Sequence, residues 1–112
     1  MNKKNTQRLL EAFPGLYADH DKPMTQTAMC WGFECRDGWF DLIWQLSEKI
    51  EAQARKEGLE PGSALWPRAV QVKEKFGGLR FYIDNGSEAI QDLIEAAETE
   101  SLCTCEDCGL PG

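Results

Sequence analysis

Basic residues are absent from the last 32 residues of this sequence. The chain of 112 residues has 12 lysines and arginines, but none follows Arg80. The final 32 residues contain eight of the 19 carboxylates, so the net charge of -7 arises at this end of the chain. The pI, near 4.7, disfavours direct binding of nucleic acid through its phosphates. Charge asymmetry of this kind carries information about partners rather than about fold.

Other features absent from the sequence narrow the expected cellular location and the expected catalytic activity. No apolar run approaches the roughly 20 residues that span a bilayer, and no apolar segment follows the basic N-terminus as in a signal peptide. We therefore expect a cytoplasmic protein without membrane association or disulfide bonds. The motifs Gly-x-Ser-x-Gly, His-Glu-x-x-His and the phosphate-binding loop are missing, and the single histidine, His20, lies in a polar turn. The sequence thus predicts no enzymatic activity.

The hydrophobic pattern predicts a single α+β domain over residues 1–112. Apolar residues recur at helical spacing in three segments, with Asp37 and Ser87 as N-caps of the second and third. Two further segments alternate around Gly77-Gly78, as in a β-hairpin. The predicted elements are helices 5–13, 38–57 and 88–101 and strands 69–76 and 79–84.

The predicted order is helix-helix-β-hairpin-helix (ααββα), followed by a cysteine-containing C-terminal tail. We expect a helix and an irregular segment over residues 1–36, the helix-hairpin-helix core over 37–101 and the tail over 102–112. The core-facing positions follow from the periods of about 3.6 residues in helices and two in strands. They are Trp39, Ile43, Leu46, Ile50, Val70, Val72, Phe81, Ile83, Leu93 and Ile94.

Three separated motifs carry a family resemblance. They are Trp31-Gly-Phe-Glu-Cys-Arg-Asp-Gly-Trp39, Val70-Gln-Val-Lys-Glu-Lys-Phe-Gly-Gly-Leu-Arg-Phe-Tyr82 and Thr104-Cys105-Glu-Asp-Cys108-Gly-Leu-Pro-Gly112. In this order they resemble a family of small uncharacterised proteins encoded by bacteriophages and prophages, over most of residues 30–112. The resemblance implies a small accessory protein in the cytoplasm of a bacterial host cell, and it implies no activity. Similar proteins continue past the Cys-Gly-x-Pro-Gly stretch into a second segment with cysteine and histidine.

The tail contains Cys105-x-x-Cys108-Gly109, which has the form of half a zinc knuckle. A structural zinc ion takes four ligands, so two further side chains are needed. Cys30 and Cys35 are the candidates if the loop before the second helix packs beside the end of the chain. The alternatives are a vestigial knuckle with free thiols and no cofactor, or a redox pair. The redox alternative lacks the helix start that usually lowers the pKa of a reactive thiol.

The third predicted helix carries a row of carboxylates spaced four, three and three residues apart, on the face opposite its apolar residues. They are Glu88, Asp92, Glu95 and Glu98. This row is either a solvated surface or a binding surface for a basic partner, as in a protein that mimics nucleic acid. Phe40 and Trp44 lie beside the apolar stripe of the second helix, and we expect them to contribute an aromatic patch to such an interaction.

Our hypothesis is a non-enzymatic interaction protein that binds a host or phage protein with a basic surface and inhibits a nucleic-acid-handling or defence complex. The alternative is a truncated zinc-ribbon-like nucleic-acid-binding accessory protein. For that alternative, one face of the hairpin combines an aromatic ring with positive charges, which can stack and hold bases. The same residues also fit a solvated outer sheet face. They are Lys73, Lys75, Arg80 and Tyr82.

Overall fold

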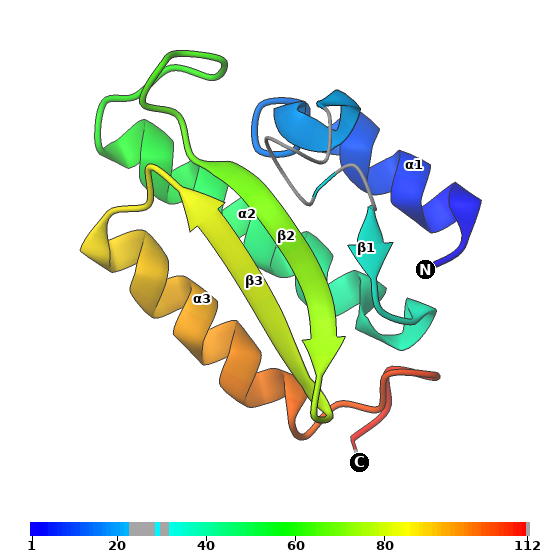
Figure 1. Cartoon of the computed structure of the whole chain (residues 1–112). Coiled ribbons are helices and arrows are strands. Elements are labelled where there is room, and N and C mark those ends of the chain that lie inside the picture. The colour runs from blue at the N-terminus through cyan, green and yellow to red at the C-terminus, as the bar shows by residue number, and fades with distance from the viewer. Residues whose placement is uncertain (23–28, 30–31, 112) are drawn as a thin grey trace.

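The computed structural model describes residues 1–22, 29 and 32–111. Over these residues it shows a small α+β domain, which confirms the predicted fold class (Figure 1). The order of the predicted helices and hairpin agrees roughly with the structure, which adds a strand between the first two helices. The elements are α1 (Lys3–Ala12), η1 (Ala18–Asp21), β1 (Phe33–Glu34), η3 (Asp37–Trp39), α2 (Phe40–Lys56), β2 (Arg68–Lys75), β3 (Gly78–Asp84) and α3 (Glu88–Ser101).

The sheet of the described region has three strands in the order β1-β2-β3. β2 and β3 pair antiparallel as the predicted hairpin. β1 pairs parallel with β2, so β1, α2 and β2 form a β-α-β unit that the sequence pattern does not predict. Phe33 and Glu34 are too few residues for a detectable alternation, and their strand exists only because they pair with β2 across the sheet.

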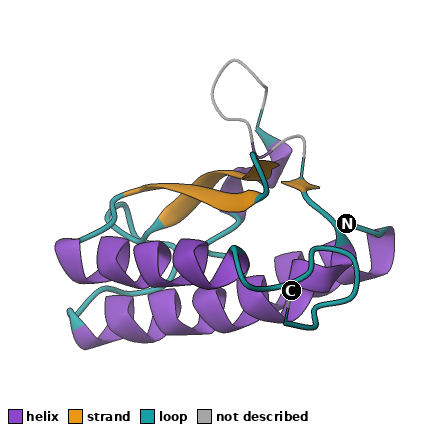
Figure 2. Ribbon diagram, turned by 90° about the horizontal axis from the view of Figure 1, so that it is seen from below, coloured by secondary structure: helices purple, strands orange, loops and turns teal. Residues whose placement is uncertain are grey.

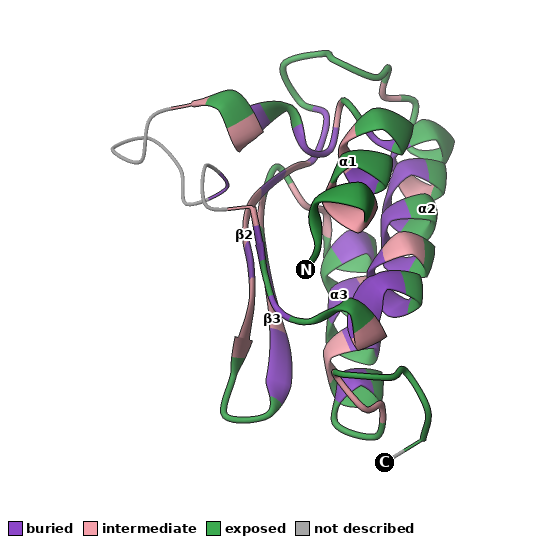
Figure 3. Cartoon of the chain, turned by 90° about the vertical axis from the view of Figure 1, so that its right-hand side faces the viewer, coloured by how far each residue is buried: buried purple, intermediate pink, exposed green. Residues whose placement is uncertain are grey.

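The helices cover one face of this sheet. Figures 2 and 3 show α2 and α3 side by side in one layer, with α1 on the same side of the sheet. The opposite face of β2 and β3 carries no α-helix from the described part of the chain (Figure 3). None of the helices over residues 1–22, 29 and 32–111 has the length and apolar character needed to cross a membrane.

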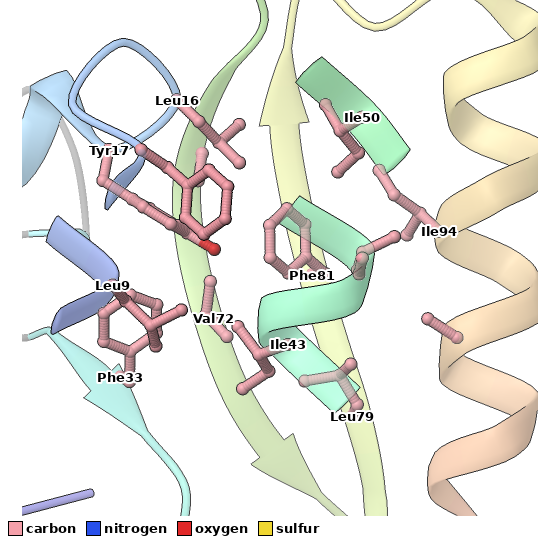
Figure 4. Packing of buried hydrophobic residues seen from close by; sticks show 14 of the residues in the cluster. Leu9, Leu16, Tyr17, Phe33, Ile43, Ile50, Val72, Leu79, Phe81 and Ile94 are labelled. Atoms are coloured by element: carbon pink, nitrogen blue, oxygen red, sulfur yellow. The ribbon is translucent and has the colours of Figure 1, made fainter. Parts of the chain in front are cut away.

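The core lies between the sheet and the helices (Figure 4). Seven of the ten residues predicted to face it are buried, and Ile83 and Leu93 pack at its margin. The prediction for Val70 is wrong because the strand register shifts between Ala69 and Gln71. An extra residue at such a bulge changes which side chains of the strand face inward. Ala69, opposite Ile83, is buried instead.

The segment before α2 contributes more to the core than its irregular sequence predicts. Leu16 and Tyr17 are fully buried. The hydroxyl of Tyr17 forms a 2.6 Å hydrogen bond with the hydroxyl of Ser47 in α2. The Tyr17 ring packs edge-on against Phe33 and Phe81, with ring centroids 4.9 and 6.4 Å apart. Tyr17 therefore joins the N-terminal segment to both the helices and the sheet.

Asp37 does not act as the predicted N-cap, because η3 precedes α2 and no side chain caps the start of α2. The carboxylate of Asp37 instead accepts hydrogen bonds from the backbone N–H of Asn2 at 2.9 Å and from the side-chain amide of Asn5 at 3.2 Å. The bond from the Asn2 backbone is the main reason that the pKa of Asp37 is lowered. Ser87 caps α3 as predicted, accepting a hydrogen bond from the N–H of Ile90 at 3.3 Å.

Candidate functional site

Three of the four carboxylates in the predicted row on α3 face solvent. Glu88, Asp92 and Glu95 are exposed, whereas Ile90 and Ile94 of the same helix are buried. The helix therefore has the two faces that its sequence predicts. Like charges three or four residues apart on a helix repel each other, and residues 81–112 contain no basic side chain to relieve that repulsion. An external cationic group would stabilise this row.

Glu98 differs from the other three carboxylates. It is half-buried, and its carboxylate accepts a hydrogen bond from the backbone N–H of Phe81 in β3 at 3.0 Å. One turn further along α3, the hydroxyl of Ser101 accepts a hydrogen bond from the backbone N–H of Leu79 at 2.9 Å. Both bonds satisfy donors on the outer edge of β3, so Glu98 attaches α3 to the sheet.

An open groove of about 680 Å³ separates the edge of β3 from the exposed side of α3. Three of the seven described residues that line it are carboxylates, and one, from β3, is basic. That residue, Arg80, is half-buried and donates a hydrogen bond from Nη1 to the carbonyl of Leu79 at 3.1 Å. The lining residues are Arg80, Asp92, Glu95, Ala96, Glu98, Thr99 and Leu102.

Two exposed apolar side chains are Leu102, which lines this groove, and Phe76, in the turn of the hairpin. Leu102 is 63% exposed, and a Cβ built on Gly78 at the base of the hairpin turn would lie 3.1 Å from it. Phe76 in the same turn is 89% exposed. The turn has two residues, and both have positive φ, 54° for Phe76 and 81° for Gly77, as in a type I′ turn. The turn thus lies one residue earlier than predicted, because Phe76 was expected to end the strand 69–76 and Gly77-Gly78 to form the turn. A bulky residue is rarely found in this conformation. An aromatic residue directly before Gly-Gly is the signal in the sequence that would have found this site.

Phe40 and Trp44 do not form the exposed aromatic patch that we expected. Phe40 is buried and Trp44 is half-buried, because α1 packs over them. The ring of Phe13 lies 5.0 Å from that of Trp44, and the guanidinium of Arg8 lies 4.6 Å from the centre of the Phe40 ring. Both aromatic residues stabilise the contact between α1 and α2.

The C-terminal tail docks beside the loop before α2. The backbone N–H of Gly38 donates to the carbonyl of Glu106 at 2.6 Å, and the indole N–H of Trp39 donates to the carbonyl of Thr104 at 3.0 Å. The guanidinium of Arg36 pairs with Asp107 at 2.7 Å. This contact between the loop and the tail is the one on which our zinc prediction depends.

The turn from Cys105 to Cys108 is closed by its own backbone. The N–H of Cys105 donates to the carbonyl of Leu110 at 2.7 Å, and the N–H of Gly109 donates to the carbonyl of Cys105 at 2.8 Å. Gly109 has a φ of 79°, which glycine adopts without strain. The sulfur of Cys105 accepts hydrogen bonds from the backbone and thiol of Cys108 and from the backbone of Asp107, and these bonds lower its pKa. The two cysteines therefore lie on one closed turn of the tail.

Cys35 directly precedes Arg36, whose backbone N–H donates to the Glu106 carboxylate of this turn. The side chain of Cys35 is buried, and burial raises the pKa of its thiol to about 12. Its carbonyl accepts a hydrogen bond from the N-terminal ammonium of Met1. Among the described residues, no three histidine, cysteine, aspartate or glutamate side chains are grouped as a metal site. Cys30 lies outside the described residues.

The outer face of the hairpin carries the basic and aromatic residues noted in the sequence. Lys73 is opposite Arg80 and Gln71 is opposite Tyr82 in the strand register. Tyr82 is 44% exposed. Glu34 of β1 accepts a hydrogen bond from the Gln71 amide at 3.5 Å, so this face combines basic, acidic and neutral side chains.

Models of protein families, curated proteins and solved structures give no match to this chain. The function is therefore inferred from the acidic groove, the exposed apolar residues and the cysteine turn.

Proposed function

We propose that this protein is a non-enzymatic interaction module that binds a basic surface of a host or phage protein. The supporting observation is the exposed row of Glu88, Asp92 and Glu95 on α3; among the described residues that line the adjoining groove, Arg80 is the single basic one. Exposed charge of one sign steers an oppositely charged partner and increases the rate of association. The row therefore favours a partner whose surface is rich in lysine and arginine.

The carboxylate row has one charge about every 5 Å along the helix axis, a spacing of the same order as that of phosphates along one nucleic-acid strand. A helix rises about 1.5 Å per residue, so the three carboxylates from Glu88 to Glu95 extend over about 10 Å. One strand of a DNA duplex carries a phosphate about every 3.4 Å along its axis. A protein that binds phosphates through basic side chains would thus meet a similar set of charges on α3. Binding there would block a nucleic-acid-handling or defence complex by competition.

Leu102 and Phe76 supply the apolar part of the proposed interface, in place of Phe40 and Trp44. A few apolar anchors usually account for most of the binding energy, while surrounding charges set the association rate and the orientation. Leu102 lines the acidic groove, and Phe76 is exposed at the nearby hairpin tip. The partner would therefore cover the end of α3 and the hairpin tip together.

The proposal is tested by reversing the three exposed charges. A partner recovered from the bacterial host with tagged protein at low salt is purified, and its binding to wild type and to a triple Lys variant at Glu88, Asp92 and Glu95 is measured by surface plasmon resonance. We expect the variant to lose binding mainly through slower association. Wild-type binding should weaken steeply with salt, because exposed charges are screened over about 8–10 Å. The wild type should also compete with DNA or RNA for the partner and bind neither by itself.

A matched control reverses three exposed carboxylates outside α3, at Glu11, Glu48 and Glu60. The control and the α3 variant have the same net charge. A difference in their partner binding therefore depends on where the reversed charges lie and not on the net charge. The control should retain partner binding. Unchanged kinetics in a folded α3 variant would contradict the proposal and leave this face as a solvated surface.

A second candidate function is binding of single-stranded nucleic acid on the outer face of the hairpin. The supporting observation is the exposed Tyr82 beside the cross-strand pair of Lys73 and Arg80. Fluorescence anisotropy with a labelled oligonucleotide at low salt separates the two candidates. Binding that is lost when Lys73 and Arg80 become Ala, and retained in the α3 variant, would favour this second function over the first.

A further inference from the structure

We propose that the turn from Cys105 to Cys108 is one half of a tetrahedral zinc site, and that the same turn of a second copy of the chain completes it. Each copy supplies two thiolate ligands, and the ion joins two tails across a two-fold axis. This inference goes beyond the acidic surface and depends on different residues. It also differs from the predicted site within one chain, which required Cys30 and Cys35.

The spacing of the two cysteines and the closed backbone of their turn suit a pair of thiolate ligands. A tetrahedral zinc ion with Zn–S bonds of about 2.3 Å holds neighbouring sulfurs about 3.8 Å apart. Cys105 and Cys108 are three residues apart on one turn, which the hydrogen bond from the Gly109 N–H to the Cys105 carbonyl closes at 2.8 Å. The backbone N–H groups of Asp107 and Cys108 also donate to the Cys105 sulfur. Such bonds orient a metal ligand and offset its negative charge.

The body of the protein holds this turn in place. The carboxylate of Glu106 accepts a hydrogen bond from the backbone N–H of Arg36 at 2.9 Å, and Asp107 pairs with the guanidinium of Arg36 at 2.7 Å. Both carboxylates of the turn are thus engaged with the loop before α2. Cys108 is exposed and Cys105 is half-buried, so the ligand pair is open to solvent and to a second chain.

A second copy satisfies the coordination number of zinc. Structural zinc takes four ligands, and one turn supplies two. A two-fold arrangement places an identical pair on the other side of the ion and needs no other residue type. Other ligand sets are tested by substituting Cys103 and Cys30. The backbone N–H of Cys103 donates to the carbonyl of Glu100 at the end of α3.

Assembly of this site has defined proton and salt dependences. Four thiols bind as thiolates, so four protons are released for each Zn²⁺ that enters, and acid opposes binding. Two acidic tails repel each other when the ion joins them, so moderate salt should promote assembly by screening that repulsion. Partner binding through α3 has the opposite salt dependence. The two proposals can therefore succeed or fail separately.

The test is a metal titration of the full chain, kept reduced by a phosphine. Zn²⁺ is added with detection by light scattering, and Cd²⁺ is added in parallel because its thiolate complexes absorb in the ultraviolet. We expect saturation near one ion per two chains, with a doubling of the mass in solution. Cys105→Ser and Cys108→Ser should each abolish both signals, and Cys103→Ser and Cys30→Ser should leave both unchanged.

Three results would overturn the proposal. They are saturation at one ion per chain in a monomer, unchanged binding in Cys105→Ser or Cys108→Ser, and no uptake of either metal by the wild type. Circular dichroism and urea melts of each variant separate loss of a ligand from loss of the fold. Because both sulfurs lie on the tail, we expect the serine variants to melt like the wild type without metal.

Discussion

At the scale of single residues, Gly38 allows the tail to approach the body of the protein. A Cβ built at Gly38 would lie 2.3 Å from the carbonyl oxygen of Glu106 and 2.4 Å from that of Cys105. These distances are far inside van der Waals contact, so any side chain at position 38 would displace the cysteine turn. A local sequence pattern cannot show this requirement, because the two segments are nearly 70 residues apart.

Substitution of Gly38 by alanine should undock the tail. We expect the amides of Cys105 and Gly109 to exchange hydrogen faster, and the free energy of unfolding to fall by about 1–3 kcal/mol through lost hydrogen bonds. Hydrogen exchange and urea melts measure these effects. The control is Gly62→Ala, which introduces backbone strain at a φ of 81° with no atom within 4 Å of the new Cβ. Equal protection of the tail in both variants would contradict the steric explanation.

Tyr17 should make stability depend on pH in alkaline solution. Burial raises the pKa of its hydroxyl above the usual value near 10, against the opposing effect of the hydrogen bond with Ser47. Above about pH 10 the unfolded chain loses this proton while the folded chain keeps it, so the free energy of unfolding should fall as the pH rises. Tyr17→Phe should reduce this slope in urea melts at increasing pH, whereas the exposed Tyr82→Phe should not. An unchanged slope in Tyr17→Phe would assign the effect to another group.

At the scale of elements, α3 closes one edge of the sheet with its side chains. The N–H groups of Leu79 and Phe81 on the edge of β3 donate to Ser101 and Glu98 instead of to another strand. An unsatisfied partly buried donor costs about 1–3 kcal/mol, and an unpaired edge is a template for association with other chains. The helix thus stabilises the sheet and protects it.

Removal of the Glu98 side chain should expose this edge. Glu98→Ala should lower the free energy of unfolding by about 1–3 kcal/mol, because the N–H of Phe81 loses its acceptor. Glu98→Gln retains an acceptor oxygen and should be closer to wild type. Glu95→Ala, on the exposed face three residues earlier, is the control and should be almost neutral. If urea melts give the same free energy of unfolding for Glu98→Ala and Glu95→Ala, the hydrogen bond between Glu98 and Phe81 contributes nothing to stability.

At the scale of the whole molecule, one hydrophobic cluster joins parts of the chain that lie far apart in the sequence. Figure 4 shows Phe81 of β3 and Val72 of β2 facing Ile43 and Ile50 of α2. Tyr17 contacts Phe81 from the N-terminal segment, with ring centroids 6.4 Å apart. A substitution in this cluster should therefore destabilise the sheet, the helices and the N-terminal segment together.

Phe81→Ala is expected to cost about 3–5 kcal/mol, because the ring is only 3% exposed and its removal leaves a cavity in the core. A cost of that size is a large part of the stability of a small domain. Urea melts measure it, with Tyr82→Ala on the outer face of the same strand as control. Near-neutral stability of Phe81→Ala would mean that the two faces of the hairpin are reversed.

The sequence by itself determined the features that repeat along the chain. The helices 38–57 and 88–101 and the hairpin were predictable because apolar residues recur with a helical or alternating period over many residues. The same periods placed Ile43 and Phe81 inside and Glu88 and Asp92 outside. The charge of the acidic end is a matter of composition and needs no structure.

Only the tertiary structure decided the features that depend on contacts between distant segments. β1 exists through pairing with β2, and α1 buries Phe40 although a helical pattern places it beside the apolar stripe. Glu98 shares the period of its exposed neighbours, yet the edge of β3 supplies it with a donor. The tail docks where Gly38 leaves room for it. A local sequence pattern predicts which face of its own helix or strand a residue lies on. These four outcomes depend instead on which distant segment of the chain packs against that face.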